Sequence, residues 1–573
     1  MRSRLLGPFF SLLFALSVFY FLYGWDVLNP HFYSWLTQGD PSQHFYGFNF
    51  FNQEHWSFPP GRVQGFDWPG GTSLVYTDSL PWLSLPLKLL FQGQIFQFHG
   101  IWILLCFLLQ GLSAYYFLFQ ACENECDATL GSFLLTLFPS FLFRAFNPSR
   151  HYSCLAHFLI FPALSLVFTS ILGSNHARSP PVRLKTRPLW IALLALSLGI
   201  HFYFFFINFI LWLVLETPYF QKNWRLEKWN LAKIGAGCVL LMWIFGYFVI
   251  PVTRSLDGGF GTYSMNLVSW INSEGYSILG ISLPEVTSEQ REGYQYLGLG
   301  IIFLSAACLS AKSEREKLKL IWKRVANSRF ELLVWFLVFL ALSVRLSFFQ
   351  YALYDWVTAP LYLIIVYGAF RRLKIQPKKA LLFTVFFLIA LLLTGRLLRS
   401  SGRVGWYLSY TLVFLLFYLK PKRTILVSAL MLQLMDVAPM IRSIRDENMA
   451  ILADHTAENS EQDFESKGLP TFLANTDKIS LVELTPSEQS PVALFALHHH
   501  LALGPVYVAR GHLKQEARDF IKQSKENLLA ATISNDIAYV TVDPQLIENL
   551  MKKDNLAMLR TGAYLWIKRS ARN

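Results

Sequence analysis

Long runs of apolar residues, separated by short polar segments, make up the first 440 residues of the chain. About twenty apolar residues cross a bilayer as one helix, and fewer suffice where neighbouring helices shield the backbone, so we predict about thirteen membrane-spanning helices. They lie near residues 5–25, 99–120, 129–145, 154–173, 188–200, 203–217, 231–250, 296–311, 331–346, 357–370, 380–396, 406–419 and 424–440.

Basic residues gather in alternate loops between these apolar segments. The segment 312–330 carries seven Lys and Arg residues, whereas the long loop 26–98 carries only Arg62 and Lys88. Loops that remain in the cytoplasm are enriched in Lys and Arg. We therefore predict a cytoplasmic N-terminus and, with an odd number of spans, an extracytoplasmic C-terminus.

Composition agrees with this prediction and excludes two other classes of protein. Charged residues make up 15% of the chain and hydrophobic residues 53%, whereas soluble domains carry about 25% charged residues. The net charge of +13 arises in short loops beside apolar runs. That distribution is typical of cytoplasmic loops and not of a surface that binds nucleic acid.

Residues 441–573 differ from the rest, because charges become dense and apolar runs shorten to the length of strands. Alternating patterns predict strands, helices and a closing hairpin. Asp543 and Pro544 form a helix N-cap followed by proline at the first helical position. The chain is thus an α-helical polytopic membrane protein, residues 1–440, with a small extracytoplasmic α/β domain, residues 441–573. The expected strands are 478–484, 505–509 and 537–542, the helices 491–503, 512–523 and 544–553, and the hairpin 556–568.

The loop 26–98 is too long for a simple connection between helices. Asp40 follows a glycine and precedes Pro41, with His44 one helical turn further on. Asp40 is either the N-cap of a helix or a catalytic carboxylate, with His44 as its partner, and the two roles can coexist. Asp78 precedes Ser79-Leu-Pro81 and is interpreted first as a second cap, and otherwise as a residue that binds substrate.

Other polar residues fall at the predicted outer ends of helices, on the same side of the membrane as Asp40. A lone histidine is usually a hydrogen-bonded structural group. Ionisable groups at membrane depth are nevertheless costly, so a convergent set is a hypothesis for a functional site. The candidates for substrate binding here are Arg150, His151 and His201, with Arg144, Asn147, His157 and Tyr203 nearby.

Three arginines, Arg396, Arg399 and Arg403, lie in a loop that the predicted topology places on the extracytoplasmic side, where few basic residues are expected. Either the topology is wrong here, or the arginines meet lipid headgroups, or they form a phosphate site together with Ser400 and Ser401. Guanidinium groups and hydroxyls suit phosphate oxygens, so we take Arg399 and Arg403 as candidate phosphate ligands.

Several motifs, taken in order, resemble the GT-C superfamily of glycosyltransferases, which use lipid-linked sugars, and more closely one bacterial family within it. The resemblance covers nearly the whole chain and lies in the order of the motifs more than in any one of them. The motifs are Gly39-Asp40-x-x-x-His44, Tyr76-Thr-Asp-Ser-Leu-Pro81, Tyr263-Ser-Met-Asn-Leu267, Tyr294-Gln-Tyr-Leu-Gly298 and Arg399-Ser-Ser-Gly-Arg403.

This resemblance implies an inverting transfer of a sugar from a polyprenyl-phosphate donor to a glycan or other envelope acceptor, at the outer face of a bacterial inner membrane. Asp40 matches the acidic residue of the superfamily's first loop, which acts as a base or organises the acceptor. Many members bind a metal through two adjacent acidic residues, whereas Pro41 follows Asp40 here. A divalent metal is the one cofactor that the resemblance allows, and we assign it no ligands. The alternative function is a non-enzymatic transporter or assembly factor for lipid-linked glycans.

Overall fold

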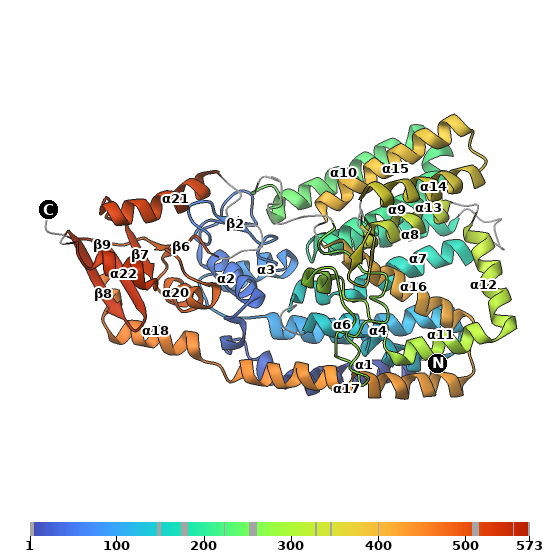
Figure 1. The fold of residues 1–573 in the computed structure, drawn as a ribbon, viewed down its shortest axis with the longest axis horizontal. Coiled ribbons are helices and arrows are strands. Elements are labelled where there is room, and N and C mark those ends of the chain that lie inside the picture. Colours follow the sequence, from blue (N-terminus) through green and yellow to red (C-terminus); the bar gives the residue numbers. More distant parts are fainter. Residues whose placement is uncertain are drawn as a thin grey trace.

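The computed structural model describes residues 5–145, 150–172, 181–222, 224–250, 261–326, 329–343, 346–353, 355–398, 400–506, 515–553 and 555–570. The molecule is elongated, with apolar helices at one end and the C-terminal sheet at the other (Figure 1). Helices of the loop 26–98 lie between these two parts, and the long helix α17 (Arg423–Leu452) leads from the first part towards the second.

Every predicted apolar segment contains a helix, because uninterrupted apolar runs leave the backbone no other way to satisfy its polar groups inside a membrane. Large apolar side chains from these helices form one continuous core. The helices are α1 (Leu6–Tyr23), α4 (His99–Cys122), α5 (Glu125–Thr136), α6 (Pro139–Leu142), α7 (Ile160–Leu172), α8 (Pro181–Leu198), α9 (Phe202–Lys222), α10 (Trp224–Phe245), α11 (Leu299–Ser310), α13 (Arg329–Leu342), α14 (Asp355–Arg372), α15 (Pro377–Leu397) and α16 (Gly405–Tyr418), followed by α17.

Fewer of these helices could cross a membrane unaided than the apolar pattern predicts. Among the described residues, three stretches are long and apolar enough by length and composition, Leu6–Tyr23, His99–Cys122 and Arg423–Ser466. Two bent pairs, α5 with the segment after it and α12 (Lys312–Val325) with α13, would raise the number to five. Four further apolar helices among the described residues are shorter, so thirteen separate spans are not supported.

The basic segment 312–330 was expected to be a loop, but most of it forms α12. Its charges alternate in sign at helical spacing, and Lys317 and Lys319 contact Glu314 and Glu316 at 3.0 and 2.7 Å. Such pairs three residues apart support an exposed helix. Ile321 and Val325 are buried, so α12 is amphipathic, a pattern that a search for continuous apolar runs does not find.

The loop 26–98 contains short elements that pack tightly on both neighbouring parts of the molecule. Its principal helix, α2, is buried around most of its circumference, and Asn49 fixes its centre. The Asn49 amide donates to the Phe96 carbonyl at 3.0 Å and accepts from the Phe96 N–H at 3.1 Å. The elements are η2 (Asp26–Leu28), η3 (Ser34–Leu36), α2 (Asp40–Gln53), β1 (Arg62–Val63), β2 (Thr72–Ser73) and α3 (Pro81–Phe91).

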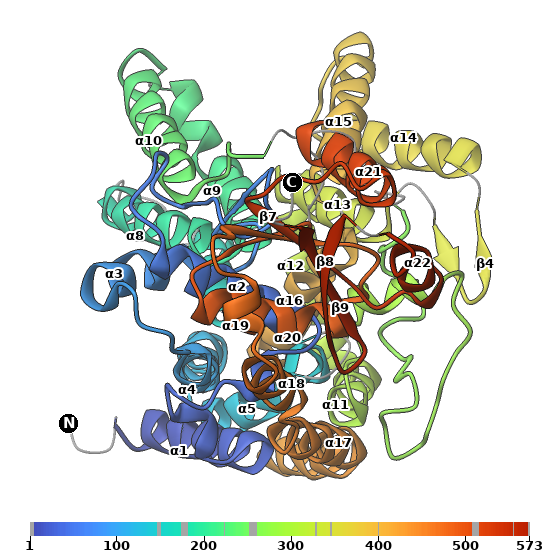
Figure 2. The same cartoon turned by 90° about the vertical axis from the view of Figure 1, so that its left-hand side faces the viewer.

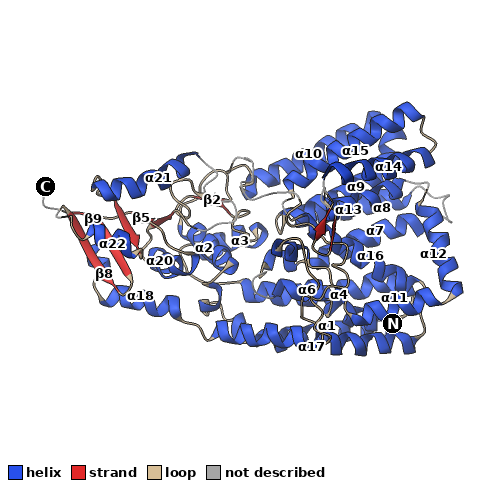
Figure 3. Cartoon of the chain, in the orientation of Figure 1, coloured by secondary structure: helices blue, strands red, loops and turns tan. Residues whose placement is uncertain are grey.

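The C-terminal region folds into a five-stranded mixed sheet in the order β6-β5-β7-β9-β8. Figure 3 shows strands of this sheet in red at the end of the molecule where the C-terminus lies. The strands pair in parallel from β6 through β5 to β7, and in antiparallel fashion from β7 through β9 to β8. The elements are α18 (Thr456–Ser466), α19 (Leu469–Phe472), β5 (Lys478–Leu481), α20 (Pro486–His498), β6 (Ala502–Gly504), α21 (Gln515–Ala530), β7 (Ile537–Thr541), α22 (Pro544–Leu550), β8 (Leu556–Thr561) and β9 (Tyr564–Arg569).

Most predictions for this region are confirmed, and one strand is displaced. Asp543 caps α22 by accepting from the Leu546 N–H at 2.6 Å, and β8 and β9 form the closing hairpin. The strand expected at 505–509 lies instead at Ala502–Gly504, and residues 507–514 are outside the described residues. A capping box at Thr485 and Glu488 starts α20 before residue 491, so the chain reaches the sheet earlier than predicted.

The sheet region is attached to the loop 26–98 by several contacts. The Tyr46 hydroxyl is 2.8 Å from Ser490 Oγ, and the Leu503 N–H donates to the Gly65 carbonyl at 2.7 Å. Figure 2, which views the molecule from the sheet end, shows α20 beside α2. The expected domain boundary at residue 440 falls within α17, which continues to Leu452.

Candidate functional site

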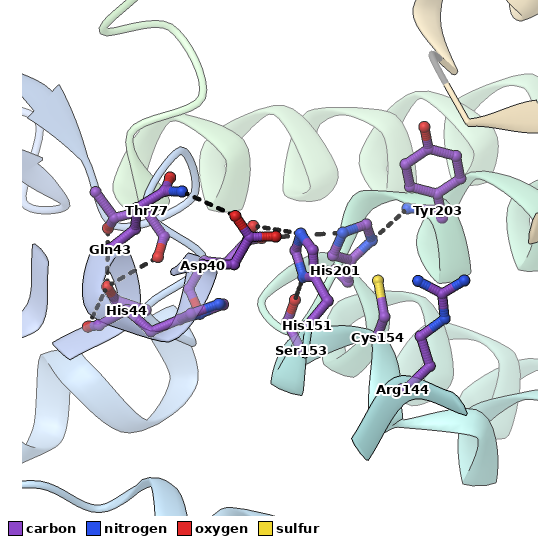
Figure 4. A network of polar contacts seen from close by, with 12 residues as sticks. Asp40, Gln43, His44, Thr77, Arg144, His151, Ser153, Cys154, His201 and Tyr203 are labelled. Atoms are coloured by element: carbon purple, nitrogen blue, oxygen red, sulfur yellow. Dashed lines mark hydrogen bonds and ion pairs between the residues drawn. The ribbon is translucent and has the colours of Figure 1, made fainter. Parts of the chain in front are cut away.

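Asp40 begins α2 but does not cap it. Gly39 is the N-cap residue, with φ of 62°, a left-handed backbone that glycine adopts easily. Asp40 and Pro41 therefore occupy the first helical positions, and no side-chain cap bond is present at this end. The interpretation of Asp40 as a cap is wrong. Its carboxylate instead accepts from the Gln43 amide at 3.3 Å, and Asp40 belongs to the polar network that also holds His151 and His201 (Figure 4).

His44 lies one turn along α2 and is buried. Its Nδ1 is 2.9 Å from the backbone carbonyl of Asp78, and its ring centroid is 5.5 Å from that of His151. Burial lowers the pKa of His44 to about 4, although the bond to the Asp78 carbonyl opposes this effect. His44 is thus a neutral group at ordinary pH. Its hydrogen bond holds the Asp78 backbone against α2.

Asp78 likewise does not act as a cap. The N-cap of α3 is Leu80, and no side-chain bond caps that helix. Asp78 has φ of 51°, and its carboxylate lies 3.3 Å from Nε2 of His151 and 3.9 Å from Nε2 of His201. Asp78 therefore connects the loop 26–98 to two histidines that come from the apolar part of the molecule.

The two histidines approach Cys154, which lies in a 3-10 turn before α7. The ligand atoms of His151, Cys154 and His201 all lie within 4.8 Å of one another. His151 Nδ1 is 3.2 Å from Ser153 Oγ, and the Tyr203 N–H donates to His201 Nδ1 at 3.2 Å. These three side chains are the group in the described part of the chain that could hold a metal ion.

Beside them, two buried arginines share one glutamate. Arg403 donates to Glu292 at 2.6 Å, and Arg144 donates to the same carboxylate at 3.3 Å. Burial alone would raise the pKa of Glu292, but the two guanidinium groups lower it to about 2. With three ionised groups, this arginine cluster carries one surplus positive charge.

Two observations describe how the arginine cluster is built and what it leaves unsatisfied. Gly293 and Gly402 are in direct backbone contact, because a Cβ on Gly402 would lie 2.6 Å from the Gly293 Cα. This contact brings Glu292 and Arg403 together. Among the described residues, the buried Nε atoms of both Arg144 and Arg403 have no hydrogen-bond partner. The cluster therefore retains donors as well as positive charge.

The three predicted arginines differ in how close they lie to this group of residues. Arg403 is buried and ion-paired, so it does not meet lipid headgroups. Arg399 lies outside the described residues. Arg150 forms an ion pair with Glu447 of α17 at 3.1 Å, which gives it a role in joining η5 (Tyr152–Leu155) and its neighbours to that helix. The structure thus brings Asp40, His44, Asp78, His151, His201 and Arg403 together and leaves Arg150 at the side.

Sequence reasoning did not select Glu292 or Cys154 as site residues, and it named Arg144 only as a neighbour of the candidates. Cys154 could have been found, because it follows His151 with the spacing His-x-x-Cys, which places two metal-ligating types on one turn. Glu292 gave no such signal, since it meets Arg403 across 111 residues of sequence. A long-range ion pair of this kind requires the tertiary structure.

The assembled residues provide three kinds of chemical group at one location. Asp40 is a carboxylate that can accept a proton, the arginine cluster can bind an anion, and the histidines with Cys154 present donor atoms that suit a metal ion.

A sequence profile for a domain of unknown function (DUF6311) matches residues 12–438. That range includes all of these residues and ends before the C-terminal sheet. No curated protein matches the chain.

Proposed function

The chain belongs to the DUF6311 family, and we propose that it is a membrane glycosyltransferase of the GT-C type. It transfers a sugar from a polyprenyl-phosphate-linked donor to an acceptor on the extracytoplasmic face of the membrane. The apolar helices α1, α4 and α17 support a membrane location. A lipid-linked donor would reach the protein from within the bilayer, so the site must be next to such helices.

One observation carries the proposal, namely that Asp40 and the arginine cluster are in the same polar network. Asp40 comes from the loop 26–98, whereas Arg403 comes from the segment between α15 and α16. His44, on the same helix as Asp40, bonds to the Asp78 backbone, and the Asp78 carboxylate contacts His151. Arg403 Nη1 in turn is 3.2 Å from Cys154 Sγ, which lies within 4.8 Å of the His151 ligand atom. A base and an anion site at one location match the two requirements of sugar transfer from a phosphate.

The reaction follows from these two groups. The Asp40 carboxylate takes the proton of an acceptor hydroxyl while the hydroxyl oxygen attacks the anomeric carbon of the sugar. The bond between that carbon and the phosphate oxygen breaks, and the lipid phosphate leaves with the electron pair. Attack from the face opposite the phosphate inverts the anomeric carbon. Arg403 and Arg144 stabilise the negative charge of the departing phosphate.

His44 and Asp78 position Asp40 and do not themselves accept the proton of the acceptor hydroxyl. Since His44 is neutral and bonded to the Asp78 backbone, it holds the loop 26–98 in one conformation against α2. Asp40 is less buried than His44, which leaves its carboxylate accessible to an acceptor. The alternative function, transport of a lipid-linked glycan, requires phosphate binding but no base.

The arginine cluster can be tested by equilibrium binding of a fluorescent polyprenyl phosphate to the purified full-length chain. Charge-assisted hydrogen bonds contribute about 1.5–3 kcal/mol each, so Arg403→Lys, which keeps the charge but loses the planar fork, should weaken binding roughly 10- to 100-fold. Arg442→Lys is the control, because Arg442 is exposed on α17. Equal affinity of wild type and a correctly folded Arg403→Lys variant would remove the phosphate site.

A further inference from the structure

A second site can be recognised beside Asp40 that sugar transfer does not require. We propose that His151, Cys154, His201 and Asp78 bind one divalent cation of the zinc type. The inference does not depend on the proposed transferase activity. It rests on three donor side chains that lie close together and on Asp78, which contacts two of them from a separate segment.

The geometry is close to that of a tetrahedral site. Zinc bonds of about 2.0–2.3 Å place tetrahedral ligand atoms roughly 3.3–3.8 Å apart. Asp78 lies 3.3 Å from His151 Nε2, which matches one edge of that tetrahedron, and 3.9 Å from His201 Nε2, which is slightly longer than an edge. The atoms of His151, Cys154 and His201 lie within 4.8 Å of one another, so the three edges among these ligands require a contraction of about 1 Å at most.

The chemical types of the donor atoms indicate which metal ion the site would prefer. Two imidazoles, one thiolate and one carboxylate favour zinc over magnesium or calcium, which prefer oxygen ligands. The Cys154 thiol would lose its proton to solvent when the ion binds. With Cys154 as the thiolate, the ligand set carries two negative charges, which balance the two positive charges of the ion.

Neighbouring groups support His151 and Cys154 in the way that metal sites require. His151 Nδ1 contacts Ser153 Oγ at 3.2 Å, which orients its Nε2 towards Asp78. Arg403 Nη1 donates to Cys154 Sγ at 3.2 Å and would stabilise the thiolate. Binding through His201 Nε2 places a proton on Nδ1, so the 3.2 Å contact from the Tyr203 N–H must lengthen as the ion binds.

Four protein ligands make a closed site, which is the arrangement of structural zinc. Asp78 belongs to the loop 26–98, His151 and Cys154 to the turns before α7, and His201 to the connection between α8 and α9. The ion would therefore fasten the loop that carries Asp40 to the apolar helices. Its removal should destabilise the protein, because a ligand that binds only the folded state stabilises that state.

The test is the metal content of the full-length chain, purified without chelator and dialysed against limiting zinc. We expect about one zinc per chain in wild type, and at least a tenfold loss of bound zinc in Cys154→Ser and in His151→Gln. Cys106→Ser is the matched control, since Cys106 is equally buried but lies on α4 outside the cluster, and it should retain zinc. A chelator should lower the midpoint of thermal unfolding of wild type and of Cys106→Ser, but not of Cys154→Ser.

Cobalt gives a second readout on the wild-type chain, independent of whether the variants fold. Cobalt bound by a thiolate produces a sulfur-to-metal charge-transfer band, which we expect in wild type and in Cys106→Ser. Three results would each overturn the proposal. They are a wild-type chain that retains no zinc, a cobalt spectrum without that band, and equal zinc in wild type and both ligand variants.

Discussion

At the residue scale, Asp40 and Asp78 show how backbone conformation decides the role of a side chain. Each aspartate precedes a proline closely, and that combination usually marks a helix N-cap. At Asp40 the helix starts one residue earlier, because Gly39 tolerates the positive φ of the cap position. At Asp78 the helix starts later, at Pro81. The sequence identified both residues as important, but the contacts of Asp78 with two histidines required the fold.

Glu292 offers a residue-scale prediction with a defined pH dependence. Its pKa is lowered from 4.5 to about 2 in the folded chain, so the stability it contributes is complete above about pH 4.5 and is lost as the pH falls through about 2. Glu292→Gln should cost about 3–5 kcal/mol at pH 7, because it leaves two buried arginines without their carboxylate. Thermal unfolding in detergent at pH 7 and at pH 3 measures the difference from wild type. The difference should shrink at the lower pH, and an equal loss at both values would contradict the assigned pKa.

At the element scale, the helices were predictable and their lengths were not. Apolar runs locate α1, α4, α11 and α13 to α17 well, because continuous apolar sequence is a strong local signal. The loop 26–98 and α12 were harder. Charged and aromatic residues hide the helical period of α12, and α2 is stabilised by long-range contacts such as that between Asn49 and Phe96. Elements of this kind depend on contacts between distant parts of the chain, which a local sequence pattern does not reveal.

The contact between α2 and α20 gives an element-scale prediction. The Tyr46 hydroxyl contacts both the carbonyl and the hydroxyl of Ser490, at 2.9 and 2.8 Å, in a buried environment. Tyr46→Phe should therefore lower the free energy of unfolding by about 1–3 kcal/mol, since it removes two buried hydrogen bonds of about 0.5–1.5 kcal/mol each. Tyr116→Phe, at an exposed position of α4, should have little effect. Equal thermal stability of the two variants would show that this bond does not join the loop to the sheet region.

At the scale of the whole molecule, the chain joins apolar helices, a polar loop and a mixed sheet along one axis (Figure 1). The site lies where the first two meet, and the sheet covers the far side of the loop. Sequence alone indicated this order, because composition changes at each step. It could not indicate that Arg403, Glu292 and Cys154 converge, since segments far apart in the chain supply them.

The proposed orientation is tested by labelling single cysteines in intact cells with a membrane-impermeant thiol reagent. In a Cys126→Ser background, which removes the exposed native cysteine, we introduce Ser313→Cys on α12 or Ala474→Cys before β5. Both positions are exposed. Because basic segments remain in the cytoplasm, only Ala474→Cys should react before the cells are opened. Reaction at Ser313→Cys alone would reverse the orientation and place Asp40 on the cytoplasmic side.

The central claim is that Asp40 is the base of a glycosyl transfer, and one rate comparison tests it most directly. The purified full-length chain is given a polyprenyl-phosphate-linked hexose with envelope glycans as acceptors, and released polyprenyl phosphate is measured over time. Because Asp40 does not cap α2, Asp40→Asn should fold and bind the lipid normally, yet release should fall about 10²- to 10⁴-fold. Asp26→Asn, an exposed carboxylate variant in the same loop, should release lipid phosphate at the wild-type rate. An Asp40→Asn variant as fast as wild type, or a wild-type chain that releases no more than a protein-free sample, would contradict the account.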